Sequence, residues 1–176
     1  MPAWSDELLR RAAAVRLALF DVDGVLTDGR LYYGADGETL KVFDSRDGHG
    51  LVLLRRHGIQ VGIVSGRNCA AVAARMTDLG VALVYQGCGD KRATLEEIWH
   101  RTGCTPAQTA FVGDDLPDLP ALRAVGLAIA VADADPGLIG ACHLRTTRPG
   151  GRGAVREVSE LILTAQGHRP MVGEAD

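Results

Sequence analysis

Short apolar runs alternate along this chain with longer segments of helical periodicity, and this alternation limits the possible folds. The expected strands cover residues 17–20, 59–64, 81–85, 109–112 and 127–131. The expected helices cover residues 1–16, 47–57, 69–79, 91–102, 116–125 and 154–165. Strands that alternate with helices at this spacing predict an α/β fold with a central parallel sheet covered on both faces. In such sheets, ligands bind at the carboxyl ends of the strands.

One segment departs from the alternation. Residues 30–33 and 38–43 flank a Gly-Ala-Asp-Gly sequence at 34–37, which is typical of the turn of a β-hairpin. Ser5 is the expected N-cap of the first helix. The expected organisation is an amphipathic helix over residues 1–16, one domain over residues 17–167 and a flexible tail over residues 168–176.

The composition is that of a soluble single domain. The chain has 176 residues, of which 47% are hydrophobic and 23% charged, enough for one sizeable core. A net charge of −3 provides no basic footprint for nucleic acid and no polybasic patch for a membrane. We find no bilayer-length apolar run and no secretory signal. The four cysteines form no C-x-x-C pair, which disfavours a zinc site and indicates reduced thiols in the cytoplasm.

Two aspartates, Asp21 and Asp23, follow the first apolar run one residue apart. Two carboxylates at the end of a buried strand are costly, because each is desolvated beside the other's charge. A cation or a reacting group is expected to offset this cost. The pattern therefore suggests a nucleophilic aspartate, a second aspartate that moves protons, and a divalent metal between them. A strand that simply ends in a turn is the alternative, since Asp and Gly are both turn residues.

Three further polar motifs also follow expected strands. They are Ser65-Gly66-Arg67, Lys91, and Gly113-Asp114-Asp115 with Asp118 shortly after. Each is ordinary by itself, because such residues commonly cap helices, form turns or face solvent. Their joint occurrence in this order, each after a strand, is the informative signal.

Together the motifs supply what phosphoryl transfer requires: a nucleophile, positive charge for the developing oxyanions, and a proton donor for the leaving oxygen. The hydroxyl and N–H groups of residues 65–66 can hold phosphate oxygens at a helix start. Lys91 would neutralise the phosphate. Asp114 would complete an oxygen-rich Mg²⁺ shell with Asp21 and the backbone carbonyl of Asp23.

This set of motifs resembles that of the haloacid dehalogenase-like hydrolases, over nearly the whole chain from residue 17 to residue 167. The resemblance implies a Rossmann-like three-layer sandwich and an aspartyl-phosphate intermediate. The roles it implies are nucleophile for Asp21, general acid/base for Asp23, phosphate ligand for Ser65 and Lys91, and Mg²⁺ ligand for Asp114. It also implies that Asp115 and Asp118 orient metal-bound water.

Several longer stretches look like the 3-deoxy-D-manno-octulosonate 8-phosphate phosphatase family. They are residues 21–29, 45–48, 85–87, 131–134 and 150–157. That family acts on a phosphorylated 2-keto-3-deoxy sugar acid in lipopolysaccharide biosynthesis and lacks an inserted cap domain. The resemblance implies that the hairpin, residues 28–43, builds a homotetramer in which a neighbouring subunit closes the active site.

The same resemblance implies the substrate contacts. The sugar-binding loop corresponds to Asp44, Ser45, Arg46, Asp47 and Gly48, and the other contacts to Asp23, Gly66, Arg67, Arg75 and Lys91. A 2-keto sugar acid carries a carboxylate, which arginine can bind with two hydrogen bonds. The residues alone leave open that Arg75 is part of a solvated helix face and that Arg46 is an ordinary loop charge.

Val52 departs from the family pattern, because octulosonate phosphatases usually have lysine or arginine there. The missing cation leaves the exact sugar open, although residues 46–48 favour the octulosonate over a nonulosonate 9-phosphate. A catalytically weak oligomeric module that regulates a sugar-activating partner is another alternative, against which the complete set of motifs argues. The lack of a cap domain disfavours a phosphomutase.

Overall fold

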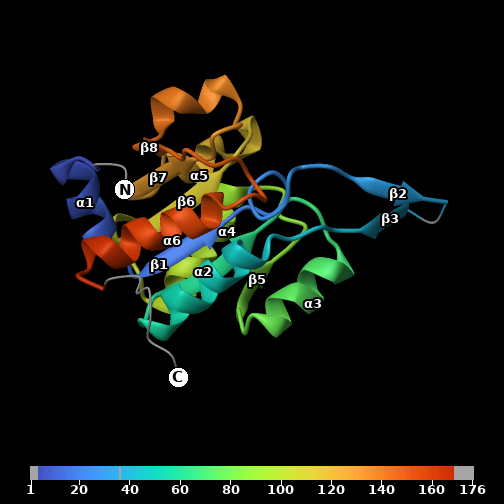
Figure 1. The fold of residues 1–176 in the computed structure, drawn as a ribbon, viewed down its shortest axis with the longest axis horizontal. Coiled ribbons are helices and arrows are strands. Elements are labelled where there is room, and N and C mark those ends of the chain that lie inside the picture. Colours follow the sequence, from blue (N-terminus) through green and yellow to red (C-terminus); the bar gives the residue numbers. More distant parts are fainter. Residues whose placement is uncertain (1–3, 36, 169–176) are drawn as a thin grey trace.

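The computed structural model describes residues 4–35 and 37–168 and contains a six-stranded parallel sheet. The strands are β1 (Leu17–Phe20), β4 (Gln60–Val64), β5 (Leu83–Tyr85), β6 (Thr109–Gly113), β7 (Leu127–Ala130) and β8 (Leu144–Arg145). Their order is β5-β4-β1-β6-β7-β8, so β1 lies inside the sheet (Figure 1). Because β1 is paired on both edges and covered on both faces, all four of its residues are buried.

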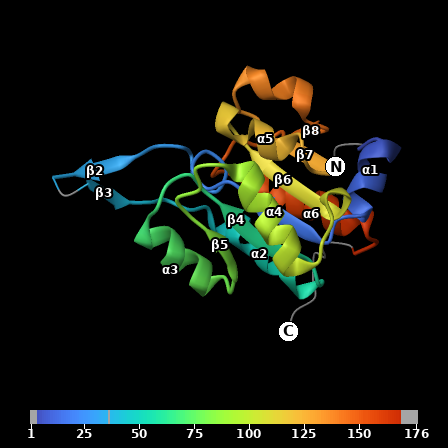
Figure 2. The ribbon, with the colours of Figure 1, turned by 180° about the vertical axis from the view of Figure 1, so that it is seen from behind.

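Helices cover both faces of the sheet, which confirms the three-layer α/β fold. They are α1 (Asp6–Ala13), α2 (Ser45–Arg56), α3 (Ala70–Asp78), α4 (Lys91–Thr102), α5 (Leu119–Leu122) and α6 (Ala154–Ala165). On one face α2 packs against α6, and α1 lies beside α6 (Figure 1), while α4 and α5 lie on the opposite face (Figure 2). Fully buried side chains such as Phe20, Leu51 and Phe111 join the layers, each contributing about 1.5–3 kcal/mol.

Local capping signals explain several element boundaries. The helices expected at 91–102 and 154–165 occur with these bounds. Asp90 caps α4 by accepting the N–H of Arg92 at 2.9 Å. The helix expected from residue 47 begins earlier, at Ser45, because Asp44 accepts the N–H of Arg46 at 2.7 Å and forms the cap.

Other expected elements also differ from the structure. The first helix, expected to reach residue 16, ends at Ala13, and the strand expected at 81–85 begins at Leu83. The expected helix 116–125 is instead a 3₁₀ turn, Leu116–Asp118, followed by the short α5. Proline lacks an N–H donor, so Pro117 and Pro120 weaken a continuous helix there. The strand β8 was not expected, because it has only two residues and no apolar run. The tail expected at 168–176 lies, from residue 169 onward, outside the described residues.

The hairpin consists of β2 (Tyr32–Gly34) and β3 (Gly37–Leu40), which pair antiparallel. It projects away from the body of the molecule (Figure 1). Large apolar side chains of this segment are exposed on the single chain: Leu31, Tyr32, Tyr33, Leu40 and Val42. No helix in the described part of the chain is long and apolar enough to span a membrane.

Candidate active site

Three neighbouring strands end at the same edge of the sheet, and each is followed by a predicted polar residue. Asp21 follows β1, Ser65 follows β4 and Asp114 follows β6. Because these strands are adjacent and parallel, the three side chains converge. They line a pocket of about 320 Å³. Its lining also includes Asp23, Gly66, Arg67, Lys91, Asp115 and Asp118.

Lys91, the first residue of α4, is a buried cation between two buried carboxylates. Its Nζ donates to Oδ1 of Asp21 at 2.8 Å and to Oδ1 of Asp118. Burial by itself would lower the pKa of Lys91, but Asp21 and Asp118 raise that pKa above its usual value. The ammonium group therefore stays charged beside Asp21, where it can also bind an anion.

Asp21, Asp114 and Asp118 form an acidic triad whose oxygens lie within 4.8 Å of one another. When the three carboxylates and Lys91 are all ionised, the group has an excess of two negative charges, which a divalent cation balances. Carboxylate oxygens are the ligands that Mg²⁺ prefers. The backbone at Gly24 has a φ of 89° and passes so close to Asp114 that a Cβ would overlap its carboxylate. The donor set fits Mg²⁺.

The loop after β4 presents a hydroxyl group to the pocket. The N–H of Ser65 donates to the Tyr85 carbonyl at 2.9 Å, and the Ser65 carbonyl accepts from Cys88 at 3.0 Å. These bonds hold the loop against the end of β5. The Ser65 Oγ accepts the N–H of Arg67 at 3.3 Å, so its hydrogen can still be donated to a ligand oxygen.

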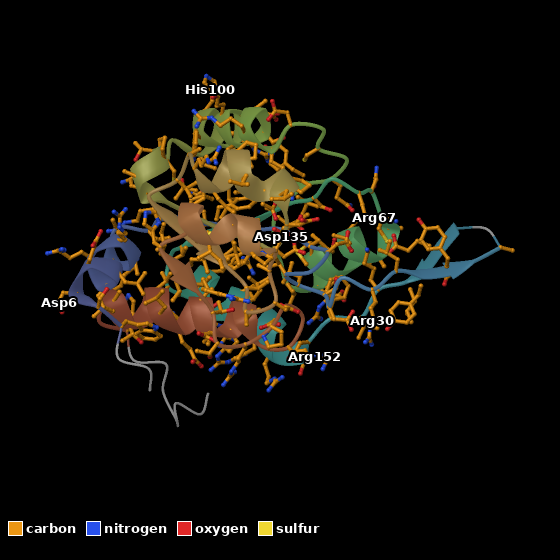
Figure 3. All side chains as sticks on the ribbon, turned by 90° about the horizontal axis from the view of Figure 1, so that it is seen from above. Asp6, Arg30, Arg67, His100, Asp135 and Arg152 are labelled. Atoms are coloured by element: carbon orange, nitrogen blue, oxygen red, sulfur yellow. The ribbon has the colours of Figure 1, made fainter. Side chains whose placement is uncertain are left out.

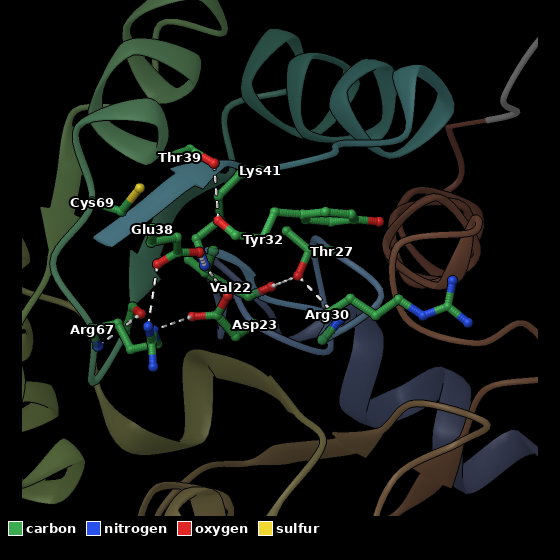
Figure 4. A network of polar contacts seen from close by, with 12 residues as sticks. Val22, Asp23, Thr27, Arg30, Tyr32, Glu38, Thr39, Lys41, Arg67 and Cys69 are labelled. Carbon is green, nitrogen blue, oxygen red and sulfur yellow. Dashed lines mark hydrogen bonds and ion pairs between the residues drawn. The ribbon is translucent and has the colours of Figure 1, made fainter. Parts of the chain in front are cut away.

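Asp23 lies in a network with two hairpin residues that the sequence analysis missed, Glu38 and Lys41 (Figure 4). Lys41 bonds Asp23, and the Nε of Arg67 lies 3.9 Å from Asp23 Oδ2. In a regular strand, residues three positions apart face opposite sides. Lys41 lies one residue beyond the end of β3, so this alternation does not apply to it. The side chains of Glu38 and Lys41 therefore turn to the same side. The sequence signal that could have pointed to these two residues is a Glu-x-x-Lys pair at the end of the expected hairpin.

The comparisons with known proteins agree with this geometry. The profile of the haloacid dehalogenase-like hydrolases matches residues 32–126. The chain is 46% identical over 162 residues to the 3-deoxy-D-manno-octulosonate 8-phosphate phosphatase of Yersinia pestis, covering 92% of this chain and 87% of the relative. This chain belongs to that phosphatase family. The Escherichia coli K12 member is 44% identical over 163 residues, covering 93% of this chain and 87% of the relative.

Solved structures of octulosonate phosphatases share the fold. The Yersinia pestis crystal structure superposes with a TM-score of 0.92 at 45% identity and covers 94% of this chain and 89% of its own. A Moraxella catarrhalis member, solved with magnesium, phosphate and KDO, has a TM-score of 0.90 at 39% identity. The match covers 93% of this chain and 94% of the Moraxella catarrhalis chain. The expected haloacid dehalogenase-like fold and family are thereby confirmed.

The remaining sugar-contact residues expected for an octulosonate phosphatase are not among the residues that line the described pocket. They are Asp44, Ser45, Arg46, Asp47, Gly48 and Arg75. The Asp47 oxygens accept the N–H groups of Gly153 at 3.0 Å and Arg156 at 2.8 Å, at the start of α6. Gly48 lies against the Arg75 guanidinium, which a Cβ would overlap. For these six residues, contact with substrate stays a prediction.

Arginine side chains also gather near the hairpin end of this phosphatase. Arg30, Arg67 and Arg152 lie at the end from which the hairpin projects, and Asp6 lies at the opposite end (Figure 3). The Arg46 guanidinium bonds Asp44 at 2.7 Å and reaches the carbonyl of Arg152 at 3.4 Å. Arg30 and Arg152 both lie within 4.0 Å of Asp28, and Arg67 lies 3.3 Å from Glu38, so the charges of these arginines are paired with carboxylates.

Burial raises the pKa of two carboxyl groups in the acidic triad. The pKa of Asp21 rises to about 6, although Lys91 lowers it in part. The pKa of Asp114 rises to about 8, through burial and then through the charges of Asp21 and Asp118. A proton therefore competes with a metal ion for Asp114 at neutral pH.

We expect Mg²⁺ to stabilise the protein more at pH 8 than at pH 6. A raised carboxyl pKa contributes stability below the unfolded value of 3.8, and this contribution is lost as pH rises through about 6 for Asp21 and about 8 for Asp114. As pH rises, the metal-free protein therefore becomes less stable, while the carboxyl groups that can bind a cation become ionised. Thermal unfolding should show a Mg²⁺-induced rise in Tm that is larger at pH 8 by about 3 °C or more. Equal shifts at both pH values, or an undiminished shift in Asp114→Asn, would contradict this.

Proposed function

We propose that this protein hydrolyses 3-deoxy-D-manno-octulosonate 8-phosphate to the free sugar acid and phosphate in a Mg²⁺-dependent reaction. The observation that carries the proposal is the pocket in which Asp21 lies beside Lys91 and belongs to an acidic triad. The substrate follows from the relatives: the Yersinia pestis protein bears this activity in its name, and the Moraxella catarrhalis structure contains magnesium, phosphate and KDO.

The proposed reaction consists of two displacements at phosphorus. A carboxylate oxygen of Asp21 attacks the phosphorus, the bond to the sugar oxygen breaks, and Asp23 protonates that oxygen. Asp23 then takes a proton from a water molecule, whose oxygen attacks the aspartyl-phosphate and releases phosphate and Asp21. Lys91 and the Ser65 hydroxyl hold the phosphate oxygens throughout. Bound Mg²⁺ supplies positive charge at the carboxylates and the phosphate.

Arg67 is proposed to contact an anionic group of the substrate. It lines the pocket, and its Nε is buried without a hydrogen-bond partner among the described residues. A buried donor without a partner is costly, and an anionic ligand would satisfy it. Val52 stands where octulosonate phosphatases usually have a cation. A nonulosonate 9-phosphate is therefore the alternative substrate.

A homotetramer in the cytoplasm is the proposed form of the enzyme. The hairpin exposes Tyr33 to 64% and Leu40 to 52%, which is unfavourable unless another surface covers these side chains. Leu31, at the foot of the hairpin, also lines the pocket, so a neighbour packed there would lie beside the active site. Light scattering should give four times the mass of one chain, and a stable monomer would contradict this assembly.

A phosphate-release screen over sugar-acid phosphates tests the proposed activity. The eight-carbon octulosonate 8-phosphate should give the highest kcat/KM, above nine-carbon acids and above p-nitrophenyl phosphate. EDTA should remove the activity and added Mg²⁺ should restore it. Preference for a nine-carbon acid would replace the proposed substrate. No turnover of any of these esters would contradict the enzyme activity and favour the regulatory module.

A further inference from the structure

Lys41 lies at the base of the hairpin with only 1% of its side chain exposed. A lysine is rarely buried in this way unless carboxylates accompany it. Its Nζ bonds Oδ1 of Asp23 and lies 2.6 Å from Oε1 of Glu38 (Figure 4). The ammonium group therefore has two anchors, one in the hairpin and one in the loop after β1.

Arg67 joins the same network from the loop after β4. Its Nη2 donates to the Tyr33 hydroxyl at 2.8 Å and to Glu38 Oε2 at 3.3 Å. When Asp23 is ionised, Asp23 and Glu38 carry two negative charges, and Lys41 and Arg67 carry two positive charges. The network is thus balanced without an added ion, in contrast to the acidic triad at Asp21. Its charges serve to fix side chains relative to one another rather than to bind a metal.

The two oxygens of Asp23 have different surroundings. Oδ1 is held by Lys41, while Oδ2 lies toward Arg67, in the wall of the pocket. An unheld carboxylate on a loop rotates about its side-chain bonds. A general acid must lie within about 3 Å of the oxygen it protonates. A misplacement of about 1 Å can lower the rate about 100-fold.

We propose that Lys41 is a positioning residue for Asp23: the hairpin holds the general acid/base in reach of the leaving oxygen through Lys41, which Glu38 anchors in turn. This inference rests on the proposed function, because that reaction gives Asp23 its proton transfers. It makes the hairpin a working part of the active site in its own subunit, separate from its proposed role in assembly.

The test uses two substrates whose leaving groups differ in their need for an acid. A sugar alkoxide must be protonated as it leaves, whereas p-nitrophenolate leaves without a proton. In Lys41→Met, kcat for the sugar-acid phosphate should fall about 10- to 100-fold, with KM changed less than about threefold. With enzyme in excess, the single-turnover release of p-nitrophenolate should stay within about threefold of wild type, because this step needs no acid.

Two further variants complete the test. Arg30→Met removes another cation near the hairpin, but one that is 71% exposed and lies 3.8 Å from Asp28, and it should leave both rates unchanged. Glu38→Gln keeps Lys41 and removes one of its anchors. It should show the same selective loss at a smaller size, about 3- to 10-fold, and it decides the question if Lys41→Met does not fold.

Equal losses on both substrates would overturn the inference, because Lys41 would then only maintain the shape of the pocket. An unchanged kcat for the sugar-acid phosphate in Lys41→Met would overturn it as well. Wild-type turnover is measured in the same experiment. Its absence would count against the proposed function, whereas wild-type behaviour of Lys41→Met would count against the role of Lys41 alone.

Discussion

Replacing Asp21 with asparagine should abolish phosphate release while leaving the fold intact. The amide has no anionic oxygen with which to attack phosphorus, and the loss of a nucleophile typically lowers kcat by on the order of 10⁴-fold or more. Asparagine has nearly the same shape, so the packing around residue 21 is preserved. Turnover is measured by phosphate release from the sugar-acid phosphate, and the fold by circular dichroism.

Asp21→Asn should also be at least as thermally stable as the wild type at pH 8 without Mg²⁺. Burial raises the pKa of Asp21 to about 6, so the charged form that predominates at pH 8 is disfavoured in the folded state. The neutral amide removes that cost. Asp78→Asn, at an exposed position at the end of α3, is the matched control and should keep wild-type activity. Substantial turnover by Asp21→Asn would exclude Asp21 as the nucleophile.

Replacing Lys91 with methionine should lower both activity and stability. The side chain bonds Asp21 and Asp118, and all three groups are buried. Removing one partner of a buried ion pair typically destabilises a protein by about 3–5 kcal/mol. Loss of a charge that stabilises the developing oxyanions typically lowers kcat about 10²- to 10³-fold. Chemical denaturation and phosphate release measure the two effects.

The stability loss in Lys91→Met should grow as pH rises. Without the ammonium group, the carboxylates relieve their repulsion only by holding protons, which they release at higher pH. Mg²⁺ should recover part of the stability but not the activity. Arg92→Met is the matched control, since Arg92 is the next residue, half exposed, and pairs with Glu96 on the helix surface. It should change stability by less than about 0.5 kcal/mol. A Lys91→Met protein as stable as this control would contradict the buried ion-pair account.

The order of strands and helices could be predicted from the sequence because it depends on local pattern. The apolar run at 17–20 is a strand, and the segment 154–165 is a helix, as expected. Asp90 caps α4 with hydrogen bonds to its own neighbours in the chain, so its role was visible from the sequence. The helix expected at 116–125 was less accurate, because two prolines compete with an apolar periodicity.

The convergence of Asp21, Ser65 and Asp114 was also predictable. Parallel strands place their carboxyl ends at one edge of a sheet, so a polar residue after each strand reaches the same place. The order of the motifs along the chain therefore predicts the pocket. The likeness to octulosonate phosphatases then suggested a substrate, which residue types at strand ends do not specify.

The sequence alone thus determined the α/β fold, the edge of the sheet that carries the site, and the residue types that meet there. Only the tertiary structure decided which long-range partner each charged group takes. Asp47, expected at the sugar, bonds the N–H of Arg156, 109 residues away. Lys41, an ordinary hairpin charge in the sequence, lies buried against Asp23. Local hydrogen bonds and apolar periodicity depend on residues that are close together in the sequence. The partner of a buried charge depends instead on how distant segments pack.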